Sequence, residues 1–231
     1  MTSMKNYLIA AALMALASLG QFVSLALFNS LVLSFFLYTL LAGLFLPFWY
    51  IRLLRKLPLR QIPAYLKLLP ESPRQVRFAL ILGTSMAMVM YLAFILVGDY
   101  FLKDGAALPV VAQWGIHRSW TSFLFLFALL LNGATEELFW RGLIHEILHD
   151  EKRRVLAVLF PALVFGAQHI FVIWRLVPNV LTTLLFMIGI IGSGLLWGYL
   201  REKTGSLFVC VLCHVIVAFG YLSILAFYLF R

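Results

Sequence analysis

A long stretch without charge opens this chain. No Asp, Glu, Lys or Arg occurs between Lys5 and Arg52. At ~1.5 Å per residue, one helix of this length would measure roughly 70 Å, which is more than two thicknesses of hydrocarbon. The stretch must therefore turn, and we expect the turn at Asn29-Ser30. It predicts two membrane-spanning helices before any other part of the chain is considered.

The composition extends this prediction to the whole chain. Hydrophobic residues make up 64% and charged residues 12%, whereas soluble domains have about 45–50% and ~25%. The apolar segments are continuous and do not alternate, so helices are expected and a β-barrel is not. The sequence predicts an all-α polytopic transmembrane bundle of seven spans, at about residues 7–28, 30–51, 78–98, 119–147, 155–173, 177–200 and 205–230.

The charges outside the spans predict the orientation. With a cytosolic N-terminus, the inner segments hold thirteen of the eighteen Lys and Arg residues, the outer segments hold four, and Arg141 lies inside a span. The outer four are Lys103, Arg118, Arg175 and Arg231. An excess of basic residues marks the cytoplasmic side, so we expect the N-terminus inside and the C-terminus outside. The net charge of +9 follows from this bias, and it indicates anionic lipids of the cytosolic leaflet as partners, not nucleic acid.

One membrane domain, 1–231, is expected. Residues 1–118 would form apolar flanking helices with a basic cytosolic loop, and 119–231 the catalytic helical core. The loop 52–77 carries four prolines and reads as an interfacial segment or as a solvated loop. The first span resembles a signal peptide up to Ala17, but its apolar run continues, so we expect it to remain uncleaved.

Three charged side chains interrupt the fourth predicted span in the run "NGATEELFWRG". Glu136, Glu137 and Arg141 exposed to lipid would together cost roughly 8–10 kcal/mol, so they should face the interior of the bundle. Glu137 and Arg141 have i,i+4 spacing and can form an ion pair on one helix face. Glu136 lies about 100° around the helix and can point elsewhere.

Two histidines lie at similar depth on other spans. Measured from the inner ends of their helices, Glu136 is ~17 Å deep, His169 ~21 Å and His214 ~14 Å. Phe165 precedes His169 by four residues, so its ring can pack beside the imidazole. A carboxylate and an imidazole in one layer can activate water, either directly or through a metal. Glu136, His169 and His214 could bind a divalent metal such as zinc, and the sequence leaves open whether one is used.

A second motif offers a different site. The string "HEILH" matches the zinc-protease pattern, with His145 and His149 as ligands and Glu146 as base. A third ligand would have to come from Glu151 or Glu202. This motif lies at the inner mouth of the fourth span, where polar residues that simply end a helix are the interpretation that fits better.

The motifs together resemble a known family. "EELFWR", then "FGAQH" on the next span and "LREKTGSLFVCVLCH" before the final histidine are similar to the CAAX-prenyl-protease and bacteriocin-processing family of intramembrane proteases. The resemblance covers roughly residues 119–220. It implies that Glu136 activates water beside His169, and that Glu137 and Arg141 shape and neutralise the site. It also implies that Phe165 packs the His169 ring, and that His214 stabilises an oxyanion or binds metal.

One position departs from the family pattern. An Asn usually follows the final histidine by four residues, and here Ala218 occupies that place. Cys210, four residues before His214, could take over part of the polar role, although a small packing residue is the simpler interpretation. Ala218 also keeps open a catalytically inactive relative that binds membrane peptides or acts as an immunity protein. A proton or ion relay in a transporter is a further alternative.

The sequence therefore predicts an intramembrane endopeptidase of the plasma membrane. Its substrate should be a membrane-bound or lipidated peptide, hydrolysed near the cytosolic leaflet. Gly194 and Gly198 form a G-x-x-x-G motif that permits close helix approach, and Gly189 and Gly192 are expected to extend the same smooth face.

Overall fold

The regular structure of this protein is helical throughout the part that can be described. The computed structural model describes residues 4–101, 107–150 and 154–230. Within them, seven helical segments are long and apolar enough to cross a membrane: Met4–Leu27, Leu31–Leu53, Pro73–Leu96, Trp120–Leu148, Arg154–Leu176, Val180–Thr204 and Leu207–Phe227. The predicted all-α bundle and its seven spans are confirmed, and the chain is a multi-pass membrane protein. Lys103, Glu151, Lys152, Arg153 and Arg231 lie outside the described residues.

Several spans are built from consecutive helical pieces. The first contains α1 (Met4–Phe22) and η1 (Val23–Leu27); the second contains α2 (Leu31–Ser34), η2 (Phe35–Phe45) and α3 (Leu46–Arg55). The fourth contains α7 (Trp120–Ala128), α8 (Leu130–Glu137), η5 (Leu138–Ile144) and α9 (His145–Leu148). Single helices form the other spans: α5 (Pro73–Phe101), α10 (Arg154–Leu176), α11 (Val180–Thr204) and α12 (Leu207–Phe230). The short helices η3 (Leu59–Gln61), α4 (Ile62–Tyr65) and α6 (Ala107–Gln113) lie in connections.

The charge-free stretch turns where the sequence predicts. Asn29 has a positive φ of 47°, a left-handed conformation that Asn adopts more readily than most residues. Ser30 then begins the second span, because its side chain accepts a hydrogen bond from the Leu33 amide at 3.1 Å. This N-cap satisfies a backbone donor that the first turn leaves without a partner.

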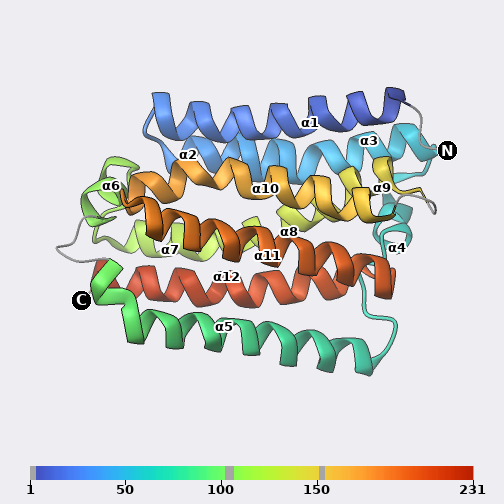
Figure 1. The fold of residues 1–231 in the computed structure, drawn as a ribbon. Coiled ribbons are helices and arrows are strands. Elements are labelled where there is room, and N and C mark those ends of the chain that lie inside the picture. Colours follow the sequence, from blue (N-terminus) through green and yellow to red (C-terminus); the bar gives the residue numbers. More distant parts are fainter. Residues whose placement is uncertain (1–3, 102–106, 151–153, 231) are drawn as a thin grey trace.

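The helices lie roughly parallel in one bundle, with α1 along one edge and α5 along the opposite edge (Figure 1). Between them, α12 packs against α5, α8 and α11, and α10 packs along α11. The fourth span runs through the middle of this arrangement, and every residue of η5 is buried. Charged groups on the fourth span are therefore kept away from lipid.

Glycines allow α10 and α11 to approach closely. A Cβ on Gly198 would lie 2.8 Å from Cγ1 of Val158, and one on Gly194 would lie 3.3 Å from Cα of Ala162. The predicted G-x-x-x-G contact is present. Gly189 and Gly192 do not extend it, because a Cβ on either would have no other atom within 4 Å; that part of the prediction is wrong, since these two glycines point away from the helix interface.

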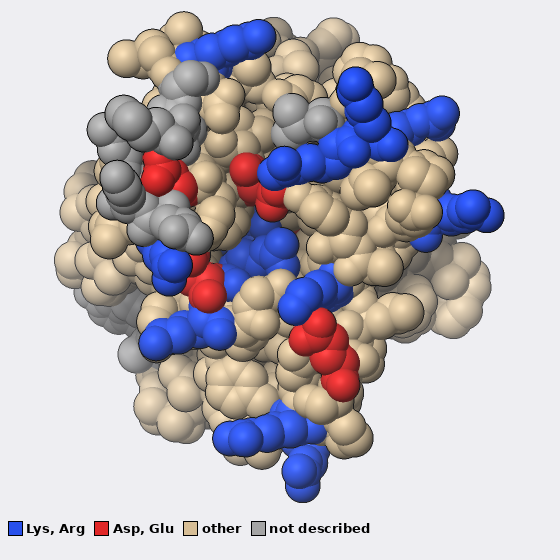
Figure 2. Space-filling model, turned by 90° about the vertical axis from the view of Figure 1, so that its right-hand side faces the viewer, with Lys and Arg blue, Asp and Glu red and all other residues tan. Residues whose placement is uncertain are grey.

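Basic side chains gather at one end of the bundle. Figure 2 shows this end, where Lys and Arg clearly outnumber Asp and Glu. Arg52 and Arg55 lie in the last turn of α3, and Arg201 and Lys203 in the last turn of α11. The loop from α3 to α5 docks here, because Ile62 and Leu66 are fully buried and the Phe208 amide donates to the Lys67 carbonyl at 3.0 Å.

Candidate active site

The fourth span delivers three charged side chains to the centre of the bundle. Glu136 and Glu137 end α8, and Arg141 follows in η5. Their exposed fractions are 3%, 0% and 1%. Burial of these charged groups costs free energy unless each has a partner of opposite charge or a hydrogen-bond partner.

Arg141 is fixed from several sides. Its Nη1 donates to Oε1 of Glu137 at 2.9 Å, which is the i,i+4 pair that the spacing predicts. Its Nη2 donates to the Gly194 carbonyl of α11, also at 2.9 Å. The guanidinium lies 5.3 Å from the ring centre of Phe165 and 5.5 Å from that of Trp197, so cation–π attraction adds to its hydrogen bonds.

His214 joins this pair from α12. Its Nδ1 lies 2.8 Å from Oε1 of Glu137, and because a carboxylate only accepts, this nitrogen carries the proton. The Trp197 ring stacks on the imidazole, with ring centres 4.0 Å apart and planes 14° apart. The orientation of His214 is therefore set by Glu137 and Trp197, and its other nitrogen, Nε2, lies 3.4 Å from Oε2 of Glu136.

Glu136 also has polar neighbours on its other oxygen. Oε1 accepts a hydrogen bond from the Asn132 amide at 2.9 Å, and Oδ1 of Asn132 accepts from the Thr39 hydroxyl at 2.7 Å. The Tyr38 hydroxyl accepts from Nε1 of Trp140 at 3.2 Å and interacts with the Glu136 carboxylate. Tyr38 and Thr39 belong to η2, so the second span helps to build the site.

The acidic and basic groups of this cluster are paired. Glu137 and Arg141 neutralise each other. Glu136 lies beside His214, with Oε2 and Nε2 3.4 Å apart. Net charge in a buried site is costly, so the pairing of acidic with basic groups favours this arrangement.

The comparisons with known proteins fit this geometry. Residues 118–220 match the family model described as type II CAAX prenyl endopeptidase Rce1-like. The chain carries an Rce1-like domain. The match begins just before the fourth span and ends within α12, so it includes Glu136, Glu137, Arg141 and His214. The resemblance inferred from the motifs is confirmed. No curated protein and no solved structure matched the chain.

Within the Rce1-like domain, His169 lies beside the cluster. Its Nδ1 donates to the Phe165 carbonyl at 2.7 Å, which leaves Nε2 as the acceptor in the neutral ring. The Phe165 and His169 rings meet edge to face, with centres 4.7 Å apart. Phe165 thus packs against His169, as the motif predicts, and the Phe165 ring also lies 6.3 Å from that of His214.

The three predicted metal ligands do not all lie within 4.8 Å of one another. Among the described residues, the group of three His, Cys, Asp or Glu side chains with ligand atoms within 4.8 Å of one another is His145, His149 and Glu202. Glu136, His169 and His214 do not form such a group; Nε2 of His214 lies 3.4 Å from Oε2 of Glu136, and the His169 ring lies against Phe165. A metal at Glu136, His169 and His214 stays a prediction.

Cys210 and Ala218 are both fully buried on α12 of the Rce1-like domain. The Cys210 thiol donates to the Trp197 carbonyl at 3.4 Å and lies 3.7 Å from the Ser206 carbonyl. These contacts tie α12 to α11 through the backbone. A polar role for Cys210 in place of the absent asparagine stays a hypothesis, and the Asn132 amide is the neutral donor that touches Glu136.

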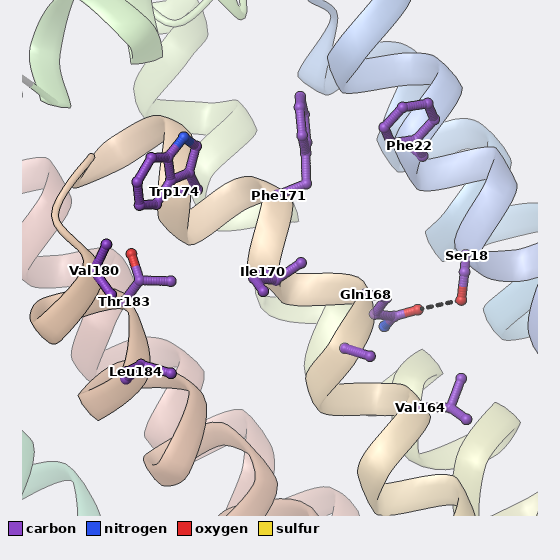
Figure 3. A pocket seen from close by; sticks show the side chains of 11 residues that line it. Ser18, Phe22, Val164, Gln168, Ile170, Phe171, Trp174, Val180, Thr183 and Leu184 are labelled. Carbon is purple, nitrogen blue, oxygen red and sulfur yellow. Dashed lines mark hydrogen bonds between the residues drawn. The ribbon is translucent and has the colours of Figure 1, made fainter.

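The cluster is closed and borders an apolar groove. Glu136, Glu137, Arg141 and His214 are each exposed by 4% or less. A groove of about 700 Å³ lies between α1, α10 and α11. Gln168 lines this groove, where its Oε1 accepts from the Ser18 hydroxyl at 3.2 Å (Figure 3). Its amide nitrogen donates to the Tyr38 hydroxyl, so Gln168 links the groove to the cluster.

The residues of the HEILH string face in two directions. His145 and His149 both contact Glu202 of α11. Glu146 instead accepts hydrogen bonds from Arg55 and Tyr65 on the other side of the helix. This second cluster lies at the basic end of the bundle, about three turns of helix from Glu136.

Sequence reasoning missed the partners that orient the charged groups. Tyr38, Thr39 and Trp197 lie in apolar spans and carry no recognisable motif. Asn132 had a weak signal, since it precedes Glu136 by four residues and therefore shares its helix face. The spans before residue 118 were expected to be a plain apolar flank, but they contribute two hydroxyl groups to the cluster.

Proposed function

We propose that this protein is an intramembrane endopeptidase that hydrolyses a peptide bond with water activated by Glu136 and His214. The observation that carries the proposal is the 3.4 Å approach of Nε2 of His214 to Oε2 of Glu136, between two spans far apart in the sequence. The Rce1-like domain supports it, because the family description is that of a CAAX prenyl endopeptidase.

The proposed reaction uses a general base that becomes a general acid. Glu136 takes a proton from water, and the resulting hydroxide attacks the carbonyl carbon of the scissile peptide bond. Protonated His214 and the Asn132 amide supply donors for the oxyanion that forms. Glu136 then returns the proton to the departing amine, and the C–N bond breaks. His169 offers Nε2 as a further acceptor to position the water.

Glu137 and Arg141 act as positioning residues in this scheme. Glu137 holds the proton of His214 on Nδ1 and so keeps Nε2 directed at Glu136, which is the usual effect of a carboxylate behind a histidine. Arg141 offsets the charge of Glu137. No step requires a metal ion.

The proposed substrate is a membrane-bound or lipidated peptide, and a prenylated peptide is the substrate that the family description implies. The groove lined by Phe22, Ala167 and Leu184 is the proposed place for its apolar chain. On α10 the groove begins at Val164 and extends away from the end where α9 lies. The tail of a lipid anchored at that end would extend in the same direction.

The proposed orientation places the basic end of the bundle in the cytosol, in a plasma membrane. Thirteen Lys and Arg residues belong to the segments expected there, and each can add about 1 kcal/mol of attraction to anionic lipid. Cleavage would then occur in the cytosolic half of the bilayer.

The test uses the purified protein in liposomes with a farnesylated fluorogenic CAAX peptide. We expect Glu136→Gln and His214→Gln each to lower the turnover rate by about 10²–10⁴-fold, the usual range for a general acid–base group. Glu71→Gln is the matched control, because Glu71 is exposed and lies in the loop before α5. Wild-type turnover by Glu136→Gln would overturn the mechanism.

Filling the groove tests the site proposed for the lipid. Ala167→Phe should raise KM for the farnesylated peptide and leave kcat near its wild-type value, because the added ring occupies the groove and not the cluster. Leu163→Phe is the control on the same helix, since Leu163 is exposed and does not line the groove. An equal effect of both substitutions would contradict this assignment.

A second candidate function follows from Ala218. Its buried methyl group replaces a side chain that the family uses as a donor, which favours an inactive relative that binds membrane peptides or serves as an immunity protein. In that case wild-type protein would cleave no lipidated peptide, and Glu136→Gln would retain the biological effect.

A further inference from the structure

Two histidines and a glutamate converge at the basic end of the bundle, outside the proposed active site. Nε2 of His145 lies 2.8 Å from Oε1 of Glu202, and Nδ1 of His149 lies 3.1 Å from the same oxygen. The ligand atoms of all three lie within 4.8 Å of one another. Three side chains from two spans thus point ring nitrogens and a carboxylate oxygen at one place.

The helix geometry explains the convergence. His145 and His149 have i,i+4 spacing, and the His149 amide donates to the His145 carbonyl at 2.7 Å, so they stand one above the other on one face. Their ring centres are 5.3 Å apart. Glu202 lies in the last helical turns of α11, next to Arg201, whose guanidinium donates to the Leu66 carbonyl at 3.4 Å. The cluster is therefore held between two helix ends that are already fixed.

Glu146 does not take part in this cluster. It accepts hydrogen bonds from Arg55 of α3 and Tyr65 of α4. Burial, together with the Glu146 carboxylate, raises the pKa of Tyr65 to about 12, so the tyrosine remains a donor at neutral pH. A glutamate that is paired with an arginine and a tyrosine is not free to activate a metal-bound water, which is the role it has in H-E-x-x-H peptidases.

We propose that His145, His149 and Glu202 bind one divalent transition-metal ion that fastens the end of the fourth span to the end of α11. Two imidazole nitrogens and one carboxylate oxygen are ligands that suit Zn²⁺, with water or another small ligand completing a tetrahedron. The metal would replace the two N–H hydrogen bonds to Glu202. The side chain of His149 is 40% exposed, which gives the ion a path from the solvent.

This site would differ in purpose from the Glu136 cluster. Its three ligands would join the end of the fourth span to α11, and α9 follows directly on η5, which carries Arg141. Metal binding would therefore stabilise the frame on which the buried ion pair rests, without touching the scissile bond. The proposal is independent of the proposed peptidase activity, because binding can be measured without a substrate.

The experiment uses full-length protein, freed of metal with a chelator in detergent micelles and then titrated with Zn²⁺ or Co²⁺. We expect one equivalent of Zn²⁺ by calorimetry, d–d absorption bands of tetrahedral Co²⁺, and a rise in Tm with Zn²⁺. His149→Ala and Glu202→Gln should abolish the Co²⁺ bands and the Zn²⁺-dependent rise in Tm. Both positions are only partly buried, so these variants are expected to fold.

Two control variants make the result specific. His117→Ala removes an exposed histidine at the opposite end of the bundle and should bind metal as wild type does. Glu136→Gln should also retain binding, whether or not it abolishes cleavage. The proposal is overturned if wild type binds no Zn²⁺, if His149→Ala and Glu202→Gln bind it as wild type does, or if Glu136→Gln alone loses it.

Discussion

Arg141→Met should be among the most destabilising single changes in this protein. Arg141 is 1% exposed and Glu137 is fully buried, and the substitution leaves the Glu137 carboxylate without its counter-charge. At the observed N···O distance of 2.9 Å, an effective dielectric constant of ~20 gives a Coulomb attraction of about 6 kcal/mol. Removing one partner of a buried pair typically costs about 3–5 kcal/mol, a large part of the ~5–15 kcal/mol that stabilises a folded domain.

A double variant separates the charge from the packing. Glu137→Gln together with Arg141→Met removes both charges, and the glutamine oxygen can still accept from Nδ1 of His214. Replacing both members of a buried pair is often close to neutral in stability. We therefore expect the double variant to recover most of the free energy of unfolding that Arg141→Met loses. The coupling energy between positions 137 and 141 in a double-mutant cycle should be well above the experimental error.

The assay is reversible unfolding in mixed micelles at increasing SDS, followed by circular dichroism. An exposed pair provides the control, because Lys67 and Glu71 have the same i,i+4 spacing and the same 2.9 Å distance. Lys67 lowers the pKa of Glu71 by hydrogen bonding, but exposed pairs are worth little, and Lys67→Met should cause no measurable change. Additive effects of Glu137→Gln and Arg141→Met would refute the reasoning.

Two further predictions concern tyrosines. Tyr38→Phe should lower the free energy of unfolding by about 1–3 kcal/mol, because the buried donors of Trp140 and Gln168 lose their acceptor; an unchanged SDS midpoint would contradict this. Burial and the Glu146 carboxylate raise the pKa of Tyr65 from its ordinary value of 10.0 to about 12 in the folded state, so its contribution to stability is complete below pH 10 and falls as the pH rises toward 12. Tm measured from pH 9 to 12 should therefore fall more steeply for wild type than for Tyr65→Phe, and parallel curves would exclude this contribution.

The candidate site was only partly accessible to sequence reasoning. Glu136, Glu137 and Arg141 are conspicuous because charge is costly inside an apolar span, and helical spacing predicts the pair between the last two. The depth estimate placed both His214 and His169 near Glu136, and the structure shows His214 in contact with Glu136 and His169 in contact with Phe165. Depth along a helix fixes one coordinate, whereas the rotation of each helix about its axis decides which side chains meet.

The HEILH string shows the same limit. Its spacing indicates two histidines on one face, and Glu202 was one of two candidate partners. Only the structure shows that Glu202 lies against both histidines while Glu146 turns toward Arg55 and Tyr65. A motif gives the order of ligands along a helix, but the neighbouring helices decide which of them are available.

The sequence alone determined that this chain crosses a membrane seven times and where it turns. Hydrocarbon rejects charge and unpaired backbone groups strongly enough for local composition to decide both. The tertiary structure alone decided that Tyr38 and Trp197, two aromatic residues of otherwise apolar helices, surround the charged groups. That choice depends on how helices pack side by side, through many weak contacts that carry no signature in the order of residues.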